Sequence, residues 1–292
     1  MEFKPSAFLQ HLLLWTVLIL SVASSASGQI VEVTIPDDGV IQKLSLKDGS
    51  TMYGRVTDVG DPMTFVLISG IELKVAHAQI LKLVDVEGTL NGQEFWVNDP
   101  NRTRLFFGPT GRTMPAGSGY FSVVELIMPL VSVAPTDWLI LSGGTPLFVG
   151  GGTFVLYGGS KVRVVSTAKT DVAVGFLAGS ETGDESDGIE GVMYGVVTHG
   201  SPDAAITLGI GYPLTGSELD RRPAIMLGGE RRVSRKVKFL TENYLFRGGE
   251  GVVSFGLRFF GSRLSADVGM AFPVGTGDFF GLPLVNFVYN WD

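Results

Sequence analysis

The chain from about residue 103 to its end alternates between apolar and polar residues over many short stretches. In the last stretch every second residue is apolar, and the residues between them include Asn286 and Asn290. The apolar positions are Val285, Phe287, Tyr289 and Trp291. A strand with one apolar and one polar face fits a β-barrel whose outer surface meets lipid and whose interior meets water. We therefore expect an all-β fold.

Turn signals divide residues 103–292 into strands of roughly ten residues, the length that a tilted membrane-spanning strand needs. Tight turns are expected at residues 134–137, 167–170, 200–203, 234–236 and 261–263. Longer connections are expected at residues 112–118, 143–152, 181–188, 215–222, 247–250 and 275–281. Short turns at one end and longer loops at the other are typical of outer-membrane barrels. The segmentation predicts an antiparallel barrel of about twelve strands, from 104–110 to 284–291, with ten or fourteen strands as alternatives.

The composition favours strands over helices as the elements that meet the membrane. The mean hydropathy is +0.30 and only 17% of the residues are charged, which is unusual for a soluble enzyme. After the N-terminal segment, no stretch approaches the roughly eighteen apolar residues of a membrane-spanning helix. The formal net charge of −7 argues against a nucleic-acid partner.

The first residues have the pattern of a cleaved signal peptide. Lys4 supplies the positive start, residues 12–22 form an apolar stretch, and small residues at 26–28 precede the expected cleavage site. We expect a signal peptide at residues 1–28, with a membrane-anchor helix as the alternative. The sequence contains no cysteine, so lipid attachment to cysteine, disulfide bonds and thiolate metal sites are excluded.

Residues 29–86 form a smaller β region. Alternating stretches separated by turns predict five short strands between about residues 40 and 86. The segments LKDGSTMYGRV and IELKVAHAQILKL resemble Sm-like and SH3-like small β-barrels. The basic residues of this module are scattered, so we expect an interaction or structural role, with a periplasmic protein as partner, rather than RNA binding. A linker rich in Gly, Asn and Asp follows at residues 87–102.

Alternation also indicates which residues of the large barrel face its lumen. Leu208 is expected to face lipid and Thr207 the lumen. On an earlier strand, Val192, Tyr194 and Val196 are likewise expected to face lipid. The charged residues assigned to the lumen are Arg163, Glu230, Arg232, Lys238, Glu242, Arg258 and Asp267. They form either a ladder of ion pairs that fills a closed barrel or the lining of a water-filled pore. The limited space inside about twelve strands favours the ladder.

No catalytic, cofactor or metal motif stands out, and we do not expect an enzyme. His77 and His199 have no spacing typical of a catalytic triad or a metal site. The acidic loop at residues 181–188 resembles part of a calcium loop but lacks the distal glutamate of the EF-hand pattern. A solvated surface loop is the simpler interpretation.

Several stretches resemble an uncharacterised family of exported Gram-negative β-barrel proteins. They are residues 104–121, 141–148, 197–212, 232–244 and 258–273. The final strand resembles the signal read by the outer-membrane assembly machinery, although Asp292 follows the last aromatic residue. The resemblance implies a lipid-embedded outer-membrane barrel of structural or narrow-channel type, with the N-terminal module in the periplasm. The alternative is a soluble exported β protein that binds a ligand or a protein partner and buries its apolar face.

Overall fold

The computed structural model describes residues 32–92, 94–147, 154–182, 189–216, 218–276 and 280–291. The predicted signal peptide, most of the acidic loop at 181–188 and Asp292 lie outside the described residues. The chain divides into two units, each described by itself. One comprises the residues up to Glu87 with Gly92–Phe95, and the other comprises Gly88–Asn91 with the residues from Trp96 onward.

The N-terminal module is a five-stranded antiparallel sheet with strand order β4-β3-β2-β1-β5. Its strands are β1 (Ile41–Leu46), β2 (Thr51–Asp58), β3 (Met63–Leu67), β4 (Glu72–Val75) and β5 (Ile80–Val86), with the short helix η1 (His77–Gln79) before β5. Its core consists of Leu44, Val56, Met63, Phe65, Val75 and Ile80. The five predicted strands are confirmed, and the likeness to SH3-like and Sm-like barrels stays a prediction. The strands β6 (Gly88–Asn91) and β7 (Glu94–Val97) form a separate two-stranded sheet.

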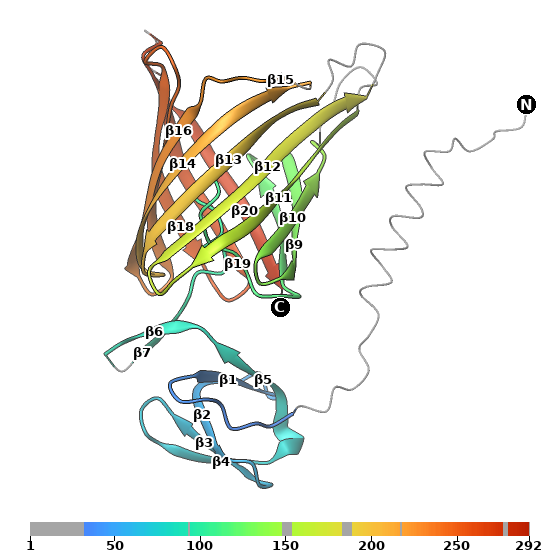
Figure 1. The fold of residues 1–292 in the computed structure, drawn as a ribbon. Helices are drawn as coiled ribbons and strands as arrows, with labels where there is room; N and C mark the ends of the chain where they lie inside the picture. Colours follow the sequence, from blue (N-terminus) through green and yellow to red (C-terminus); the bar gives the residue numbers. More distant parts are fainter. Residues whose placement is uncertain are drawn as a thin grey trace, which may run out of the picture. The chain divides into compact units, whose positions relative to one another are not determined.

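Twelve antiparallel strands form a closed barrel (Figure 1). The first six are β8 (Gly119–Val124), β9 (Met128–Thr136), β10 (Leu139–Gly144), β11 (Phe154–Ser166), β12 (Thr170–Thr182) and β13 (Ile189–Gly200). The others are β14 (Ala204–Thr215), β16 (Ala224–Ser234), β17 (Val237–Leu245), β18 (Gly251–Phe260), β19 (Leu264–Val274) and β20 (Leu282–Trp291), with the short β15 (Glu218–Leu219) beside β14. Pairing of β20 with β8 closes the ring. The predicted barrel of about twelve strands is confirmed.

The predicted first strand, residues 104–110, is wrong: it contains only an isolated bridge between Arg104 and Pro109. The residues between 118 and 134, which the predicted turns leave undivided, form both β8 and β9 instead. The turn between these strands places Glu125 at φ 49° and Leu126 at φ 63°. Such turns usually contain Gly, Asn or Asp, so this turn has no sequence signal. The count of twelve is right because the two errors cancel.

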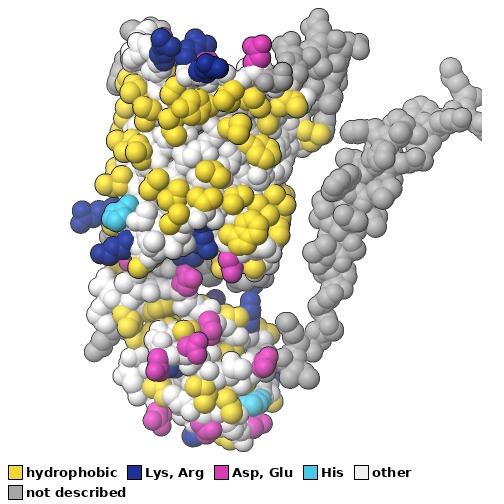
Figure 2. All heavy atoms as spheres, viewed as in Figure 1, with side chains coloured by type: hydrophobic (Ala, Val, Ile, Leu, Met, Phe, Trp, Pro, Cys, Tyr) yellow, Lys and Arg dark blue, Asp and Glu magenta, His cyan; other side chains and the backbone are white. Residues whose placement is uncertain are grey.

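The outer surface of the barrel is apolar. On β14, Ile206 and Leu208 are 65% and 54% exposed, whereas the alternating residues Ala205 and Thr207 are buried. On the face of the barrel in view, Figure 2 shows hydrophobic side chains over the middle and charged side chains near the two ends. No second sheet covers this surface among the described strands, so the exterior has the apolar face that a lipid-facing barrel would need.

The predicted facing of β13 is wrong. Val196 points inward and is only 2% exposed, whereas Met193 and Val197 point outward and are 52% and 40% exposed. Both faces of this strand are apolar here, so alternation does not distinguish them. In the register with β14, Val196 is paired with Gly209, so its inward side chain lies beside a residue that has no side chain.

The two ends of the barrel differ. The tight turns between β9 and β10, β11 and β12, β13 and β14, β16 and β17, and β18 and β19 all lie at the end where β8 begins and β20 ends. We call this the tight-turn end. The other end, called the loop end, carries the longer connections together with the short turn at Glu125–Leu126.

Candidate functional site within the barrel lumen

Residues 98–118, called the inner segment below, connect β7 to β8 inside the ring of strands (Figure 1, teal to green). Most residues from 101 to 114 are buried, with Phe107 the exposed exception. Leu105 and Phe106 are completely buried, at 0% exposure. They pack against the wall residues Leu240, Ala271 and Leu284. An irregular segment in such a place needs hydrogen-bond partners for its backbone groups, and the side chains of the barrel wall supply many of them.

The inner segment enters and leaves at the tight-turn end. Just before it, the carbonyl oxygen of Val97 accepts a hydrogen bond of 2.9 Å from Arg232 Nη2, near the turn that follows β16. Near its end, Arg112 Nη2 donates to the carbonyl oxygen of Ser201 at 2.8 Å, in the turn between β13 and β14. The segment therefore forms a loop that extends into the lumen and returns.

Arg258 on β18 joins the barrel wall to the inner segment. Its Nε and Nη2 donate to the two carboxylate oxygens of Asp267 at 2.6 and 3.0 Å. Nη1 donates to Asp99 Oδ2 at 3.2 Å and to the Asn101 carbonyl oxygen at 2.9 Å. Nη2 also donates to the carbonyl oxygen of Leu105 at 2.6 Å. Because the guanidinium is completely buried, these contacts must replace its hydration, and they fix the position of the inner segment.

Lys238 on β17 extends this network. Its Nζ lies 3.3 Å from Asp99 Oδ2 and 2.9 Å from Glu230 Oε2. The other oxygen of Glu230 accepts a hydrogen bond from Arg112 Nη1 of the inner segment. Burial alone raises the pKa of the Asp99 carboxyl, but the charges of Lys238 and Arg258 lower that pKa to about 2. Asp99 is therefore an anion between two cations at neutral pH.

Glu242 on β17 holds the innermost part of the segment. Its carboxylate accepts hydrogen bonds of 3.0 Å from the backbone amides of Phe107 and Gly108, and one of 2.7 Å from the Tyr244 hydroxyl. The segment comes very close to the wall here: a Cβ atom on Gly108 would collide with the sulfur of Met226 and lie 2.8 Å from the Tyr244 hydroxyl. Glycine at position 108 permits this approach.

The predicted lumen charges thus occupy different places. Glu230, Lys238, Arg258 and Asp267 belong to one network, and Glu242 binds the segment separately. Arg232 lies at the tight-turn end, where its Nη1 contacts Asp203 Oδ1 at 2.9 Å and its guanidinium stacks 5.0 Å from the centre of the Trp96 ring. Arg163 on β11 is half-buried and lies apart from these contacts.

Sequence reasoning missed the lumen residues that come from the inner segment itself. Asp99 lies in the predicted linker, Arg104 begins the predicted strand 104–110, and Arg112 begins the predicted loop 112–118. The available signal was the set of opposite charges in a stretch rich in Gly, Pro and Asn that lacks steady alternation. A segment of this kind must bury its charges against partners elsewhere, and the lumen charges are those partners.

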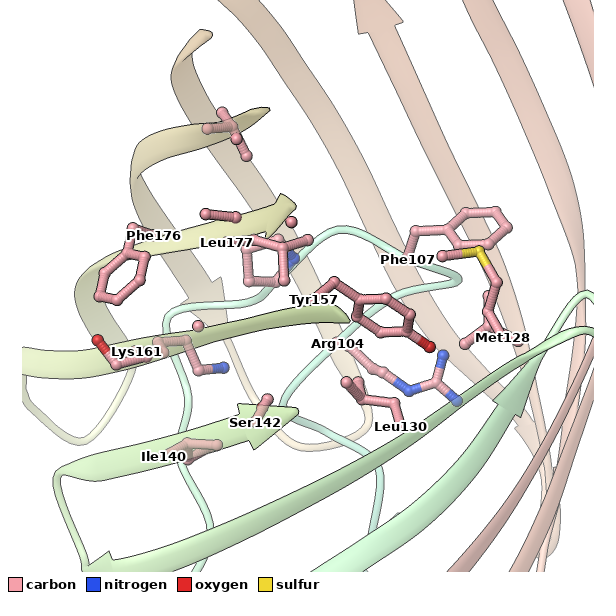
Figure 3. Close-up of a pocket in the computed structure, with 18 of the residues that line it drawn as sticks. Arg104, Phe107, Met128, Leu130, Ile140, Ser142, Tyr157, Lys161, Phe176 and Leu177 are labelled. Carbon is pink, nitrogen blue, oxygen red and sulfur yellow. The ribbon is translucent and has the colours of Figure 1, made fainter. Parts of the chain in front are cut away.

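The other half of the wall, formed by β8–β13, borders a cavity of about 670 Å³ (Figure 3). Its lumen-facing residues are largely apolar or aromatic and include Tyr120, Leu130, Ile140, Tyr157, Leu177, Val192 and Tyr194. The inner segment contributes Arg104, Phe106, Phe107 and Pro109 to the lining. Other lining residues, among them Val124, Met128 and Glu190, lie near the loop end. The cavity therefore extends from the inner segment toward the loop end.

The residues of the predicted assembly signal lie on β20. Phe287 and Tyr289 face outward and are 50% and 43% exposed, and Val285 and Trp291 have the same parity and are half-buried. Asn286 and Asn290 between them are buried on the lumen side. Whether the assembly machinery reads this strand stays a prediction.

Within the described ranges, no cluster of three or more His, Asp or Glu side chains could hold a metal ion. The same residues include no helix with the length and hydropathy needed to cross a membrane.

No protein-family model matches the chain, and no curated protein matches it in sequence. Among solved structures it is similar to the KdgM porin, with 8% identity and a TM-score of 0.43 over 59% of this chain and 95% of the porin. It is also similar to a loop L8 deletion mutant of OmpT, an outer membrane protein of Vibrio cholerae, with 13% identity and a TM-score of 0.35 over 86% of this chain and 96% of that one. Identities of this size do not transfer a function.

Proposed function

We propose that this protein is an integral outer-membrane barrel whose lumen is closed by its own inner segment. It acts as a structural barrel or as a channel too narrow for steady ion flow, and its N-terminal module lies in the periplasm and binds a protein partner. The observation that carries the proposal is the combination of an apolar exterior with a lumen whose buried charges bind the chain itself.

Two physical arguments support this reading over a soluble protein. Apolar side chains on consecutive outward positions, such as Val253, Phe255, Leu257 and Phe259, are all more than a third exposed. In a bilayer, a charged side chain at mid-depth on such a face would cost about 2–4 kcal/mol. Apolar residues at all of these positions are therefore what a lipid-facing strand requires. Exposed to water, a belt of this size would instead promote aggregation.

Fractionation tests the location. We expect the protein in the outer-membrane fraction, with a gel mobility that changes on heating, because a closed barrel resists detergent until it is heated. Recovery of the whole protein from the soluble periplasm would contradict the membrane assignment and favour the soluble, ligand-binding alternative.

Conductance in planar lipid bilayers tests the closure. We expect no steady current from the wild type, and a steady current when residues 101–112 are replaced by a Gly–Ser stretch of equal length. If that variant does not insert, Glu242→Ala is the second test, because it removes the acceptor of the Phe107 and Gly108 amides. Glu250→Ala, on an exposed residue of the loop before β18, is the matched control. A steady current from the wild type would show that the lumen is an open pore.

A further inference from the structure

We propose that the cavity is a binding site for an apolar carboxylate: a molecule with one carboxylate group on a medium-length acyl or similar apolar body. This inference goes beyond closure of the lumen, because it concerns the space that the inner segment leaves unfilled. Its volume of about 670 Å³ lies within the range of roughly 300–1,000 Å³ that is usual for small-molecule sites.

The wall of the cavity selects an apolar body. Leu177 faces the lumen and is nevertheless 44% exposed, because its side chain borders the cavity. Figure 3 shows Leu177, Tyr157 and Leu130 around the same space. Apolar side chains with a few convergent polar groups are the usual lining of a ligand site. In a lumen that is otherwise highly charged, such a wall needs an explanation.

Arg104 supplies the anion-binding group. The residue is 6% exposed and projects among Tyr157, Met128 and Leu130 in Figure 3. Its Nη1 donates to the carbonyl oxygen of Phe106, but its buried Nε and Nη2 have no hydrogen-bond partner. Buried donors of this kind are rare, because leaving them unpaired is unfavourable. A ligand carboxylate would supply the missing acceptors after small movements of the side chains above the guanidinium.

The neighbouring carboxylate does not satisfy Arg104. Asp267 Oδ2 is 3.6 Å from Arg104 Nη2, beyond hydrogen-bond distance, and already accepts hydrogen bonds from Arg258 at 3.0 Å and from Asn286 at 3.4 Å. Asp267 is thus shared between two arginines, and Arg258 has the better geometry. Asp267 therefore neutralises the charge of Arg104 only in part, and a second anion could bind the same guanidinium.

Lys161 adds a second basic side chain beside the inner segment, where it also lines the cavity. Its Nζ donates to the carbonyl oxygens of Thr103 and Thr110, at 2.7 and 3.1 Å, and no carboxylate of the described residues lies within ion-pair distance of it. Glu190, which also borders the cavity, is exposed near the loop end. The positive charge of Arg104 therefore lies beside the inner segment and the carboxylate of Glu190 lies near the loop end, so an anionic head group is drawn toward the inner segment.

Calorimetric titration of the full-length protein in lipid nanodiscs tests the proposal, with decanoate, decanol and decyltrimethylammonium as probes and empty nanodiscs as the partition control. We expect one decanoate per protein, bound at least about tenfold more tightly than either other probe, because charge-assisted hydrogen bonds are roughly twice as strong as neutral ones. Arg104→Met is expected to remove this preference while leaving decanol binding unchanged.

A second variant keeps the test independent of Arg104, whose loss could also disturb the inner segment. Leu177→Trp places a larger side chain inside the cavity and should lower the affinity for decanoate by more than tenfold. Val174→Trp adds the same side chain to the outward face of the same strand and should leave the affinity unchanged. Equal affinity for the three probes, or decanoate binding that survives in Leu177→Trp, would overturn the proposal. Neither readout depends on conductance, so failure here is distinguishable from an open lumen.

Discussion

The two halves of the lumen wall differ in what they hold. The half formed by β16–β20 contributes charged side chains, including Lys238, Glu242 and Arg258, and binds the inner segment through its backbone and its charges. The half formed by β8–β13 contributes mainly aromatic and aliphatic side chains and borders a cavity. One barrel can thus fix a segment against one wall with directional hydrogen bonds and leave a space of ligand size beside the other wall.

Arg258→Met should have the largest effect, because it removes the group that joins both carboxylates, Asp99 and Asp267, to the inner segment. Breaking a buried ion pair by removing one partner costs about 3–5 kcal/mol. We expect a lower unfolding temperature in detergent micelles and faster hydrogen exchange throughout residues 98–118. Arg263→Met, on an exposed residue of the turn after β18, is the control. Equal stability of the two variants would contradict the division between the walls.

Glu242→Gln should have a smaller effect. The amide retains one acceptor but directs an N–H group toward a backbone donor of Phe107 or Gly108, so one charge-assisted hydrogen bond is lost, at about 1.5–3 kcal/mol. We expect faster hydrogen exchange at those two amides and little change at residues near Arg232. Glu250→Gln should leave both regions unchanged. Uniformly faster exchange along the segment would mean that the anchors do not act locally.

Acid should reduce the free energy of unfolding through the contacts of the charged wall, and not through those of the apolar wall. The pKa of Asp99 is lowered to about 2 from an ordinary value of 3.8, so its contribution is fully present above about pH 4 and is lost as the pH falls through about 2. That contribution is on the order of 2 kcal/mol. Between pH 4 and pH 2 the unfolding temperature should fall more in the wild type than in Asp99→Asn, as measured by circular dichroism. Parallel pH profiles would show that Asp99 is not held as an anion.

The smallest effects come from one substitution made on both walls. Tyr244→Phe removes a hydroxyl that donates to Glu242 Oε1 at 2.7 Å and should cost about 1–2 kcal/mol. Tyr194→Phe, on the apolar wall, removes a hydroxyl for which no hydrogen bond occurs among the described residues and should cost less than about 0.5 kcal/mol. Urea unfolding of both variants measures the difference. Equal costs would mean that the walls are energetically alike.

Prediction from sequence succeeds where one local pattern determines the structure. The strands β14, β18, β19 and β20 alternate cleanly, and their outward and inward residues follow directly from that period. It fails on β13, where both faces are apolar, and at Glu125 and Leu126, where an unusual turn contains none of the usual residues. It also fails for residues 104–110, since a buried segment without regular pairing can look like a short strand.

The sequence alone determines the all-β class, the alternation between exterior and lumen on most strands, and the set of charges that cannot face lipid. Those features are local, because they depend on neighbouring residues and on the two-residue period of a strand. Only the tertiary structure decides what the lumen charges contact. Arg258 and Asp99 are far apart in the sequence, and they meet only because the ring closes around the inner segment. Closure of the ring likewise separates the charged wall from the apolar one and creates the cavity between the inner segment and the loop end.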